Sequence, residues 1–180
     1  LPPLGRLPRR PPVLLPRPPH PPPTAVAGVP LYNVPQLPAP YSFPELDTIH
    51  YMETLLTDAH AGVEKPAAIV LETVQADGGI NPFPVEWLQR VRALCDKYDI
   101  LMIVDDIPVG CARTGWFFSF ERAGIVPDTV TQSKSIACYG MPSALLPPKP
   151  HLDSRSPGEP PAPSPPTPPS SVPAHPPLAY

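Results

Sequence analysis

Hydrophobic residues recur every three or four positions in two stretches of the chain, which is the spacing of an amphipathic helix. The first stretch predicts a helix over about 45–57. The second follows a loop rich in glycine and proline at 78–84, and charged residues occupy its opposite face. The apolar stripes consist of Leu46, Ile49, Met52, Leu55 and Leu56 in the first helix and of Leu88, Val91, Leu94, Cys95 and Tyr98 in the second.

Uniformly apolar runs flank the second helix, at 67–71 and at 100–104. Buried parallel strands have this composition, because both of their faces are covered. The first run ends on Glu72 and the second on Asp105-Asp106. Strand, helix and strand in this order form a βαβ unit, whose crossover is right-handed.

Three further elements are expected after this unit. They are an aromatic helix around 116–123, a short strand near 128–131 and an apolar piece at 144–146. The alternation predicts an α/β fold with a mainly parallel sheet in a three-layer arrangement. Ligands of such sheets bind beyond the carboxyl ends of the strands, where Glu72 and Asp105 are expected.

Proline divides the chain into three parts. Of its 36 prolines, 16 lie in residues 1–44, 6 in 45–146 and 14 in 147–180. Proline removes a backbone donor and disfavours helix in the residue before it. We therefore expect 45–146 to form the folded core, and 1–44 and 147–180 to be disordered or corrupted segments in which a sheet or helix is hard to build.

Charge and cysteine content exclude several classes of protein. A net charge of −3 gives no indication of binding to nucleic acid or to a membrane, and no apolar run is long enough to span one. Four arginines in the first 44 residues form only a weakly basic tail. The three cysteines have no CxxC spacing, which favours reduced thiols and a cytoplasmic location over disulfides or a zinc site.

The pair Asp105-Asp106 permits three interpretations from its position alone. The carboxylates could cap a nearby helix, they could bind magnesium, or one of them could hold the pyridinium nitrogen of a cofactor. Lys134 lies between two serines after the last predicted strand. A lysine in this position is commonly a surface residue, but one that is partly desolvated becomes nucleophilic toward an aldehyde.

Four short segments resemble the class III pyridoxal-phosphate-dependent aminotransferases. They are Val-Asp-Asp-Ile at 104–107, Arg-Thr-Gly at 113–115, Pro-Asp at 127–128 and Ser-Lys-Ser at 133–135. The resemblance extends over about 25–159 and is strongest in 64–146. It implies a partial large domain of the fold-type I transferases, with pyridoxal 5′-phosphate as the cofactor.

The resemblance also implies a role for each site residue. Lys134 forms the Schiff base and shuttles protons, and Asp105 keeps the pyridinium nitrogen protonated. Ile107 packs on the face of the ring, and Glu72 helps to sort the amino donor from the acceptor. Arg113, in the Arg-Thr-Gly loop, is expected to be structural.

Within the class, the chain is most similar to the transaminases of ectoine biosynthesis. That similarity implies transfer of an amino group between glutamate/2-oxoglutarate and aspartate semialdehyde/2,4-diaminobutyrate by a homodimer. Other members of the class act on ornithine, acetylornithine or 4-aminobutyrate, and a non-catalytic remnant or a proline-rich interaction protein is a further alternative.

The chain departs from the family at several positions near the implied site. Pro108 replaces a glutamine that hydrogen-bonds the phenolic oxygen of the cofactor. Ala112 replaces a glycine, which would be costly if that residue has a positive φ. Gln132 replaces an apolar residue, and Ala137 and Cys138 replace a small polar residue and a glycine.

Overall fold

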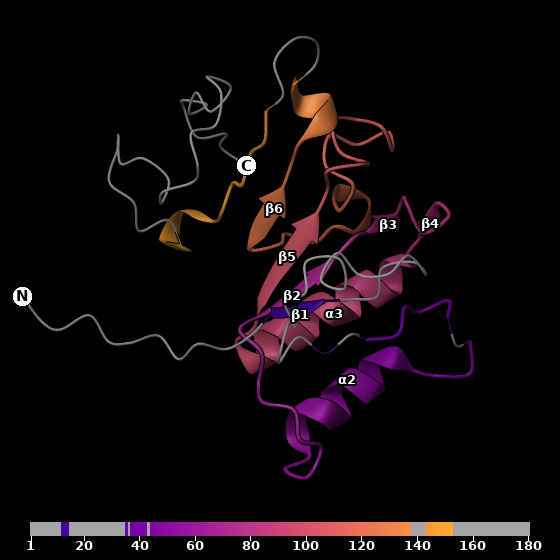
Figure 1. The fold of residues 1–180 in the computed structure, drawn as a ribbon, viewed down its shortest axis with the longest axis vertical. Coiled ribbons are helices and arrows are strands. Elements are labelled where there is room, and N and C mark those ends of the chain that lie inside the picture. Colours follow the sequence, from indigo (N-terminus) through magenta and orange to yellow (C-terminus); the bar gives the residue numbers. More distant parts are fainter. Residues whose placement is uncertain (1–11, 15–34, 36, 43, 138–142, 153–180) are drawn as a thin grey trace, which may run out of the picture.

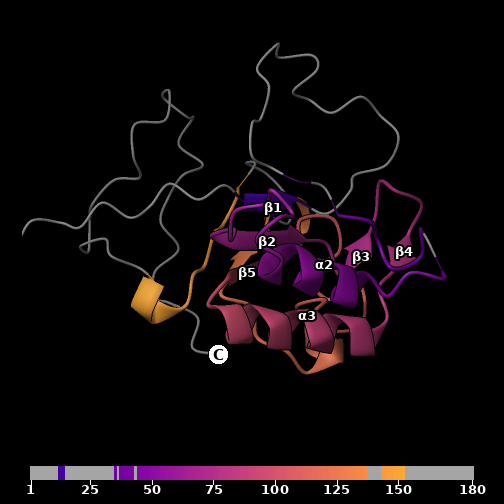
Figure 2. The same ribbon diagram turned by 90° about the horizontal axis from the view of Figure 1, so that it is seen from below.

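The computed structural model describes residues 12–14 (backbone only), 35, 37–42, 44–137 and 143–152. Most of the two proline-rich segments, and Cys138, lie outside this range. The described residues form a four-stranded parallel sheet in the order β1-β2-β5-β6, with helices packed beside it (Figures 1 and 2). Its strands are β1 (Pro12–Leu14), β2 (Ala68–Leu71), β5 (Leu101–Asp105) and β6 (Thr129–Thr131).

The sheet presents one fully buried face. The register pairs Ile69 with Met102 and Leu71 with Val104, and Val104 pairs in turn with Val130. All five side chains are buried in one hydrophobic core. Because side chains alternate along a strand, the intervening residues lie on the other face, where Leu101 is 37% exposed.

Helix α3 (Val85–Tyr98) connects β2 to β5 and covers the buried face. Its predicted apolar stripe is confirmed, with Leu88, Val91, Leu94 and Cys95 all buried. Burial raises the pKa of the Cys95 thiol to about 12. The helix ends at Asp99, which adopts the left-handed conformation typical of a C-cap.

Helix α2 (Thr48–Thr57) packs against α3 and confirms the first predicted helix, with a later start. The Asp47 carboxylate accepts the amides of Ile49 and His50 and caps the helix, which therefore begins at Thr48, three residues after the predicted beginning. The Trp87 indole donates to the Thr48 hydroxyl at 2.7 Å and fixes the contact between the two helices.

One expected helix does not form, and one strand lies where a sheet was expected to be hard to build. The segment 116–123 contains only a 3₁₀ turn, η1 (Glu121–Ala123), because the Glu121 carboxylate binds the Phe118 amide and Gly124 ends the turn with φ +63°. A strand does form in the first proline-rich segment, since β1 is an edge strand and Pro12 is its first residue, where no donor is required.

The predicted core also extends beyond residue 146. The Lys149 amide donates to the Asp128 carbonyl at 2.8 Å, and the Val130 amide donates to Pro147. A short turn, η3 (Pro150–Leu152), ends the described chain. No helix in the described ranges is long and apolar enough to cross a lipid bilayer.

The parallel sheet and the βαβ unit confirm the predicted α/β class. A small antiparallel pair, β3 (Val74–Gln75) with β4 (Asn81–Pro82), follows β2 and was not anticipated. It forms the hairpin that carries the chain away from Glu72.

Candidate active site

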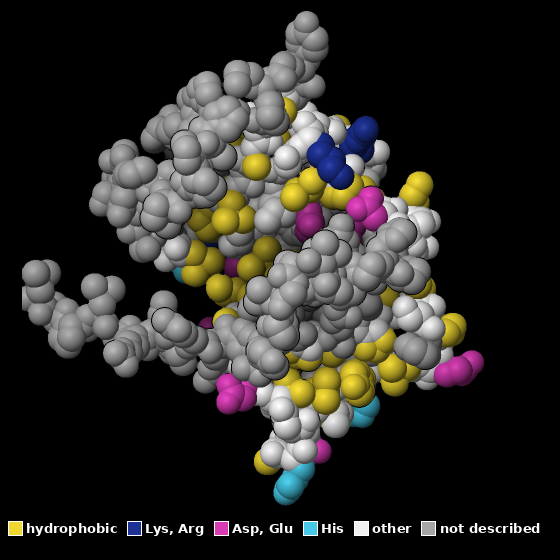
Figure 3. Space-filling model, viewed as in Figure 1, with side chains coloured by type: hydrophobic (Ala, Val, Ile, Leu, Met, Phe, Trp, Pro, Cys, Tyr) yellow, Lys and Arg dark blue, Asp and Glu magenta, His cyan; other side chains and the backbone are white. Residues whose placement is uncertain are grey.

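The carboxyl ends of three neighbouring strands bring the predicted site residues to one edge of the sheet. Glu72 directly follows β2, beside Asp105 at the end of β5, because Leu71 pairs with Val104. Asp105 pairs in turn with Thr131 at the end of β6, and Lys134 follows three residues later. Acidic and basic side chains lie together at the end of the molecule that carries this edge (Figure 3).

Asp105 is half-buried and fixed through one of its oxygens. Its Oδ1 accepts the Ile107 amide at 3.1 Å and the Thr131 hydroxyl at 3.2 Å. Its Oδ2 has no hydrogen-bond donor among the described residues. The arrangement is that of an anion with one oxygen held by the fold and the other available to a ligand.

Lys134 begins the 3₁₀ turn η2 (Lys134–Ala137) and is exposed. Its φ of +53° places it in the left-handed region of backbone conformation, which residues other than glycine rarely adopt. Within the described ranges its amine forms no ion pair or hydrogen bond. The preceding Ser133 hydroxyl donates to the Ser143 carbonyl at 3.0 Å and anchors the loop.

The other predicted residues lie in the segments that follow β2 and β5. The Glu72 carboxylate accepts the Ala76 amide at 3.1 Å. Ile107 and Pro108 are half-buried in the turn that follows Asp105, and Arg113 is exposed in the next loop. Ala112 has φ +64°, which confirms that the glycine expected there would occupy a left-handed position.

The magnesium interpretation of Asp105-Asp106 is not supported. No group of three or more histidine, cysteine, aspartate or glutamate residues in the described chain could hold a metal ion. Asp106 is instead 1% exposed and turns away from Asp105 into the interior. Burial raises the pKa of its carboxyl, and hydrogen bonds from Ser119 and Gln132 offset part of this effect.

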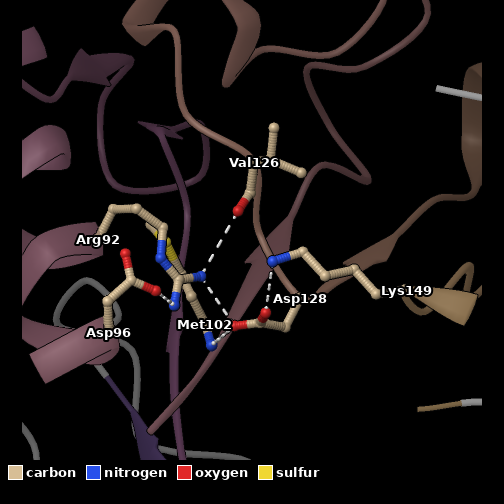
Figure 4. Close-up of polar contacts among 6 residues, drawn as sticks. All are labelled: Arg92, Asp96, Met102, Val126, Asp128 and Lys149. Carbon is tan, nitrogen blue, oxygen red and sulfur yellow. Dashed lines mark hydrogen bonds and ion pairs between the residues drawn. The ribbon is translucent and has the colours of Figure 1, made fainter. Parts of the chain in front are cut away.

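Asp128 centres an ion cluster that sequence reasoning did not identify (Figure 4). Its carboxylate accepts Arg92 at 2.7 Å, Lys149 at 2.8 Å and the Met102 amide at 2.8 Å. Arg92 also binds Asp96. Burial alone would raise the pKa of Asp128, but the bonds from Lys149, Met102 and Arg92 outweigh it and hold that pKa below its usual value.

An apolar groove lies between α2 and the loop before β2, where hydrophobic side chains gather on the surface (Figure 3). Its lining has no polar side chain, so it cannot do the chemistry expected of an active site. The lining residues are Pro35, Leu37, Met52, Leu55, Leu56, Val63, Pro66 and Ile69.

Comparisons with known proteins agree on one family. Residues 23–153 match the family described as Aminotransferase class-III. The chain is 50% identical over 133 residues to a Virgibacillus pantothenticus protein named diaminobutyrate--2-oxoglutarate transaminase, covering 74% of this chain and 32% of the relative. A Nocardia farcinica protein of the same name is 52% identical over 136 residues, covering 75% and 31%. The chain thus spans about a third of the length of these relatives.

Solved structures give the same result for the fold. A transaminase from the marine bacterium Virgibacillus superimposes with a TM-score of 0.62 at 25% identity, covering 73% of this chain and 32% of the other. The N-acetylornithine aminotransferase from Stenotrophomonas maltophilia superimposes with a TM-score of 0.55 at 28% identity, covering 76% and 32%.

Proposed function

The chain belongs to the class III aminotransferase family, and we propose that it supplies the Schiff-base lysine and the pyridinium-binding aspartate of such an enzyme. Its sheet and helices form part of the large domain of fold-type I. The observation that carries the proposal is the placement of Asp105 and Lys134 at one edge of this sheet, each with a group that no described residue binds.

The proposed reaction transfers an amino group between glutamate/2-oxoglutarate and aspartate semialdehyde/2,4-diaminobutyrate. The relatives of 50–52% identity that carry the name diaminobutyrate--2-oxoglutarate transaminase support this choice. It would be the first committed step toward ectoine, in the cytoplasm, with the complete protein acting as a homodimer. We propose that Glu72 contributes to the choice between amino donor and acceptor.

The donor set at the sheet edge fits pyridoxal phosphate. The cofactor, when bound, supplies an electron sink for bonds at the amino-bearing carbon. A carboxylate held at a strand end suits a protonated ring nitrogen, and an unpaired lysine suits an aldehyde. No phosphate-binding residue is assigned within the described part of the chain.

Each residue has a separate task in this proposal. Asp105 would keep the proton on the ring nitrogen with its Oδ2, while Thr131 and the Ile107 amide hold Oδ1. The Lys134 amine would hold the cofactor through its aldehyde group, with loss of water, and once released it would move a proton at the amino-bearing carbon. Ile107 would exclude water from one face of the ring.

Pro108 weakens the proposed site. A proline has no side-chain group that could hydrogen-bond the phenolic oxygen, so this contact of the family is missing. We expect Pro108→Gln to lower by about tenfold the pyridoxal phosphate concentration needed for half-maximal labelling of Lys134 in the borohydride experiment described next. This factor corresponds to one hydrogen bond worth about 1.4 kcal/mol.

Reductive trapping tests the proposal. The 180-residue chain is incubated with pyridoxal 5′-phosphate, treated with borohydride, and mapped by peptide mass spectrometry. We expect the label on Lys134, because Lys97 and Lys149 are paired with Glu53 and Asp128. Lys134→Arg should remove the label, whereas Lys65→Arg should not. Label distributed equally over all lysines, or absent from Lys134, would refute the proposed role and favour the non-catalytic remnant.

A further inference from the structure

A chain of buried hydroxyl and carboxyl groups runs beneath the candidate site. The Ser119 hydroxyl donates to Asp106 Oδ1, and it also hydrogen-bonds the Thr73 hydroxyl. Since the one Ser119 proton is directed at Asp106, the Thr73 hydroxyl is the donor to Ser119. The three side chains are at most 1% exposed, so water cannot replace these bonds.

The two ends of this chain are sequence neighbours of two site residues. Thr73 follows Glu72, and Asp106 follows Asp105. The Thr73 carbonyl is held by the Phe83 amide at 2.9 Å and by the Arg122 guanidinium at 3.2 Å. The Asp106 amide donates to the Thr131 carbonyl at 3.0 Å, and its carbonyl accepts the Gly110 amide at 2.9 Å.

A third branch leads toward Lys134. The buried Gln132 amide donates to Asp106 Oδ2 at 3.0 Å, and the Gln132 backbone exchanges two hydrogen bonds with Leu145. The space beside this contact admits only glycine at position 110. A Cβ there would lie 2.6 Å from Gln132 Nε2 and 2.7 Å from Asp106 Oδ2.

We infer that Asp106 and Ser119 are positioning residues, which hold Glu72 and Asp105 in a fixed relation through the hydrogen-bonded chain Thr73–Ser119–Asp106. The importance of Glu72 and Asp105 rests on the function proposed above. The coupling between their two backbone segments does not, and it is a property of the fold without any ligand.

Two amide groups report directly on the two carboxylates. The Ala76 amide donates to Glu72, and the Ile107 amide donates to Asp105. Their hydrogen exchange, followed by NMR on the full chain, therefore measures how firmly each carboxylate is held. The amides of Val91 and Cys95 in α3 serve as the reference for global opening.

A substitution at one end of the hydrogen-bonded chain Thr73–Ser119–Asp106 should change amide exchange at the other end. Thr73→Val removes the hydroxyl without a large change in volume, and we expect exchange of the Ile107 amide to become about tenfold faster. Thr73→Ser retains the hydroxyl and should preserve the protection. Asp106→Asn should accelerate exchange of the Ala76 amide in the same way.

Thr114→Val provides the matched control. No described residue hydrogen-bonds the buried Thr114 hydroxyl, so its removal should leave both reporter amides unchanged. The inference is overturned if Ile107 exchange is the same in Thr73→Val and Thr73→Ser, or if the α3 amides accelerate by the same factor. The trapping experiment on Lys134 separates failure of this inference from failure of the proposed function. An unlabelled Lys134 refutes the cofactor role, while the exchange rates still decide whether the two backbone segments are coupled.

Discussion

The turn after Asp106 contains two consecutive residues, Cys111 and Ala112, with φ of +58° and +64°. A side chain with a Cβ is strained in this region, whereas glycine is not. The strain lies close to the candidate site, since the Cys111 thiol contacts the Gln132 side chain at 3.5 Å. Relief of this strain should therefore stabilise the segment that carries Ile107 and Pro108.

Ala112→Gly should increase the free energy of unfolding by about 1 kcal/mol, because glycine adopts the left-handed conformation without a steric penalty. Urea unfolding followed by circular dichroism measures the change. Ala93→Gly is the matched control, since Ala93 is exposed within α3 and glycine should lower stability there by about 0.5–1 kcal/mol. Equal signs for the two substitutions would contradict the assignment of strain to Ala112.

The sequence alone was sufficient to predict Lys134, Asp105 and Glu72 as site residues, because each lies in a segment that resembles a known motif. It did not reveal the role of Asp106. Its partners, Ser119 and Gln132, are 13 and 26 residues away and come from different elements. No local pattern encodes a contact of this kind, so only the tertiary structure could show it.

At the level of secondary structure, periodicity predicted the strands and helices that bury a continuous apolar surface. It failed at 116–123, where Phe118 and Phe120 are buried on either side of Ser119, which faces Asp106. It also did not show that β6 is followed by chain that binds back to it. Backbone hydrogen bonds and the ion pair between Lys149 and Asp128 make that connection, and Arg92 joins the same carboxylate to α3.

Asp128→Asn should lower the free energy of unfolding by about 3 kcal/mol at neutral pH, because the Arg92 guanidinium, on a side chain only 12% exposed, loses the less exposed of its two anionic partners. Asp96→Asn is the control. Asp96 also binds Arg92, but its side chain is 66% exposed, and its removal should cost less than about 0.5 kcal/mol. Urea unfolding of both variants would show whether burial of the pair decides the effect.

The pH dependence of the same cluster follows from the lowered pKa of Asp128. A carboxyl whose pKa is lower in the folded state stabilises the fold above its unfolded pKa, and this contribution is lost as the pH falls through the folded pKa. The difference in stability between the unaltered chain and Asp128→Asn should thus be constant near neutral pH and shrink below the ordinary value of 3.8. If the stability difference between the two chains instead grew on acidification, the pKa of Asp128 would be raised in the folded state and not lowered.

On the scale of the whole molecule, the sheet is asymmetric within the described ranges. Helix α3 covers the face that contains Met102 and Val104, while the face that contains Leu101 and Ile103 is partly open. The three-layer arrangement predicted from the sequence requires a second covering layer on that face. The described part of the chain, which spans about a third of its relatives, accounts for a four-stranded sheet and the helical layer on one face.

Adjacent residues of β5 provide the test of this asymmetry. Met102 is fully buried and Leu101 is 37% exposed, on opposite faces. Met102→Ala should lower the free energy of unfolding by about 2–5 kcal/mol, because it leaves a cavity in the core. Leu101→Ala should cost about 1 kcal/mol. Comparable losses in urea unfolding would mean that the second face is covered in solution.

The parallel pairing of β2, β5 and β6 also has a kinetic consequence. Two parallel strands are joined by a crossover connection, so they can pair only once the chain between them has closed this long loop. The unit β2–α3–β5 contains one crossover and more than half of the buried core residues, so it can assemble first. β6 and the segment bound to it by Lys149 can join only afterwards, so the edge that carries Asp105, Thr131 and Lys134 would be completed in the last steps of folding.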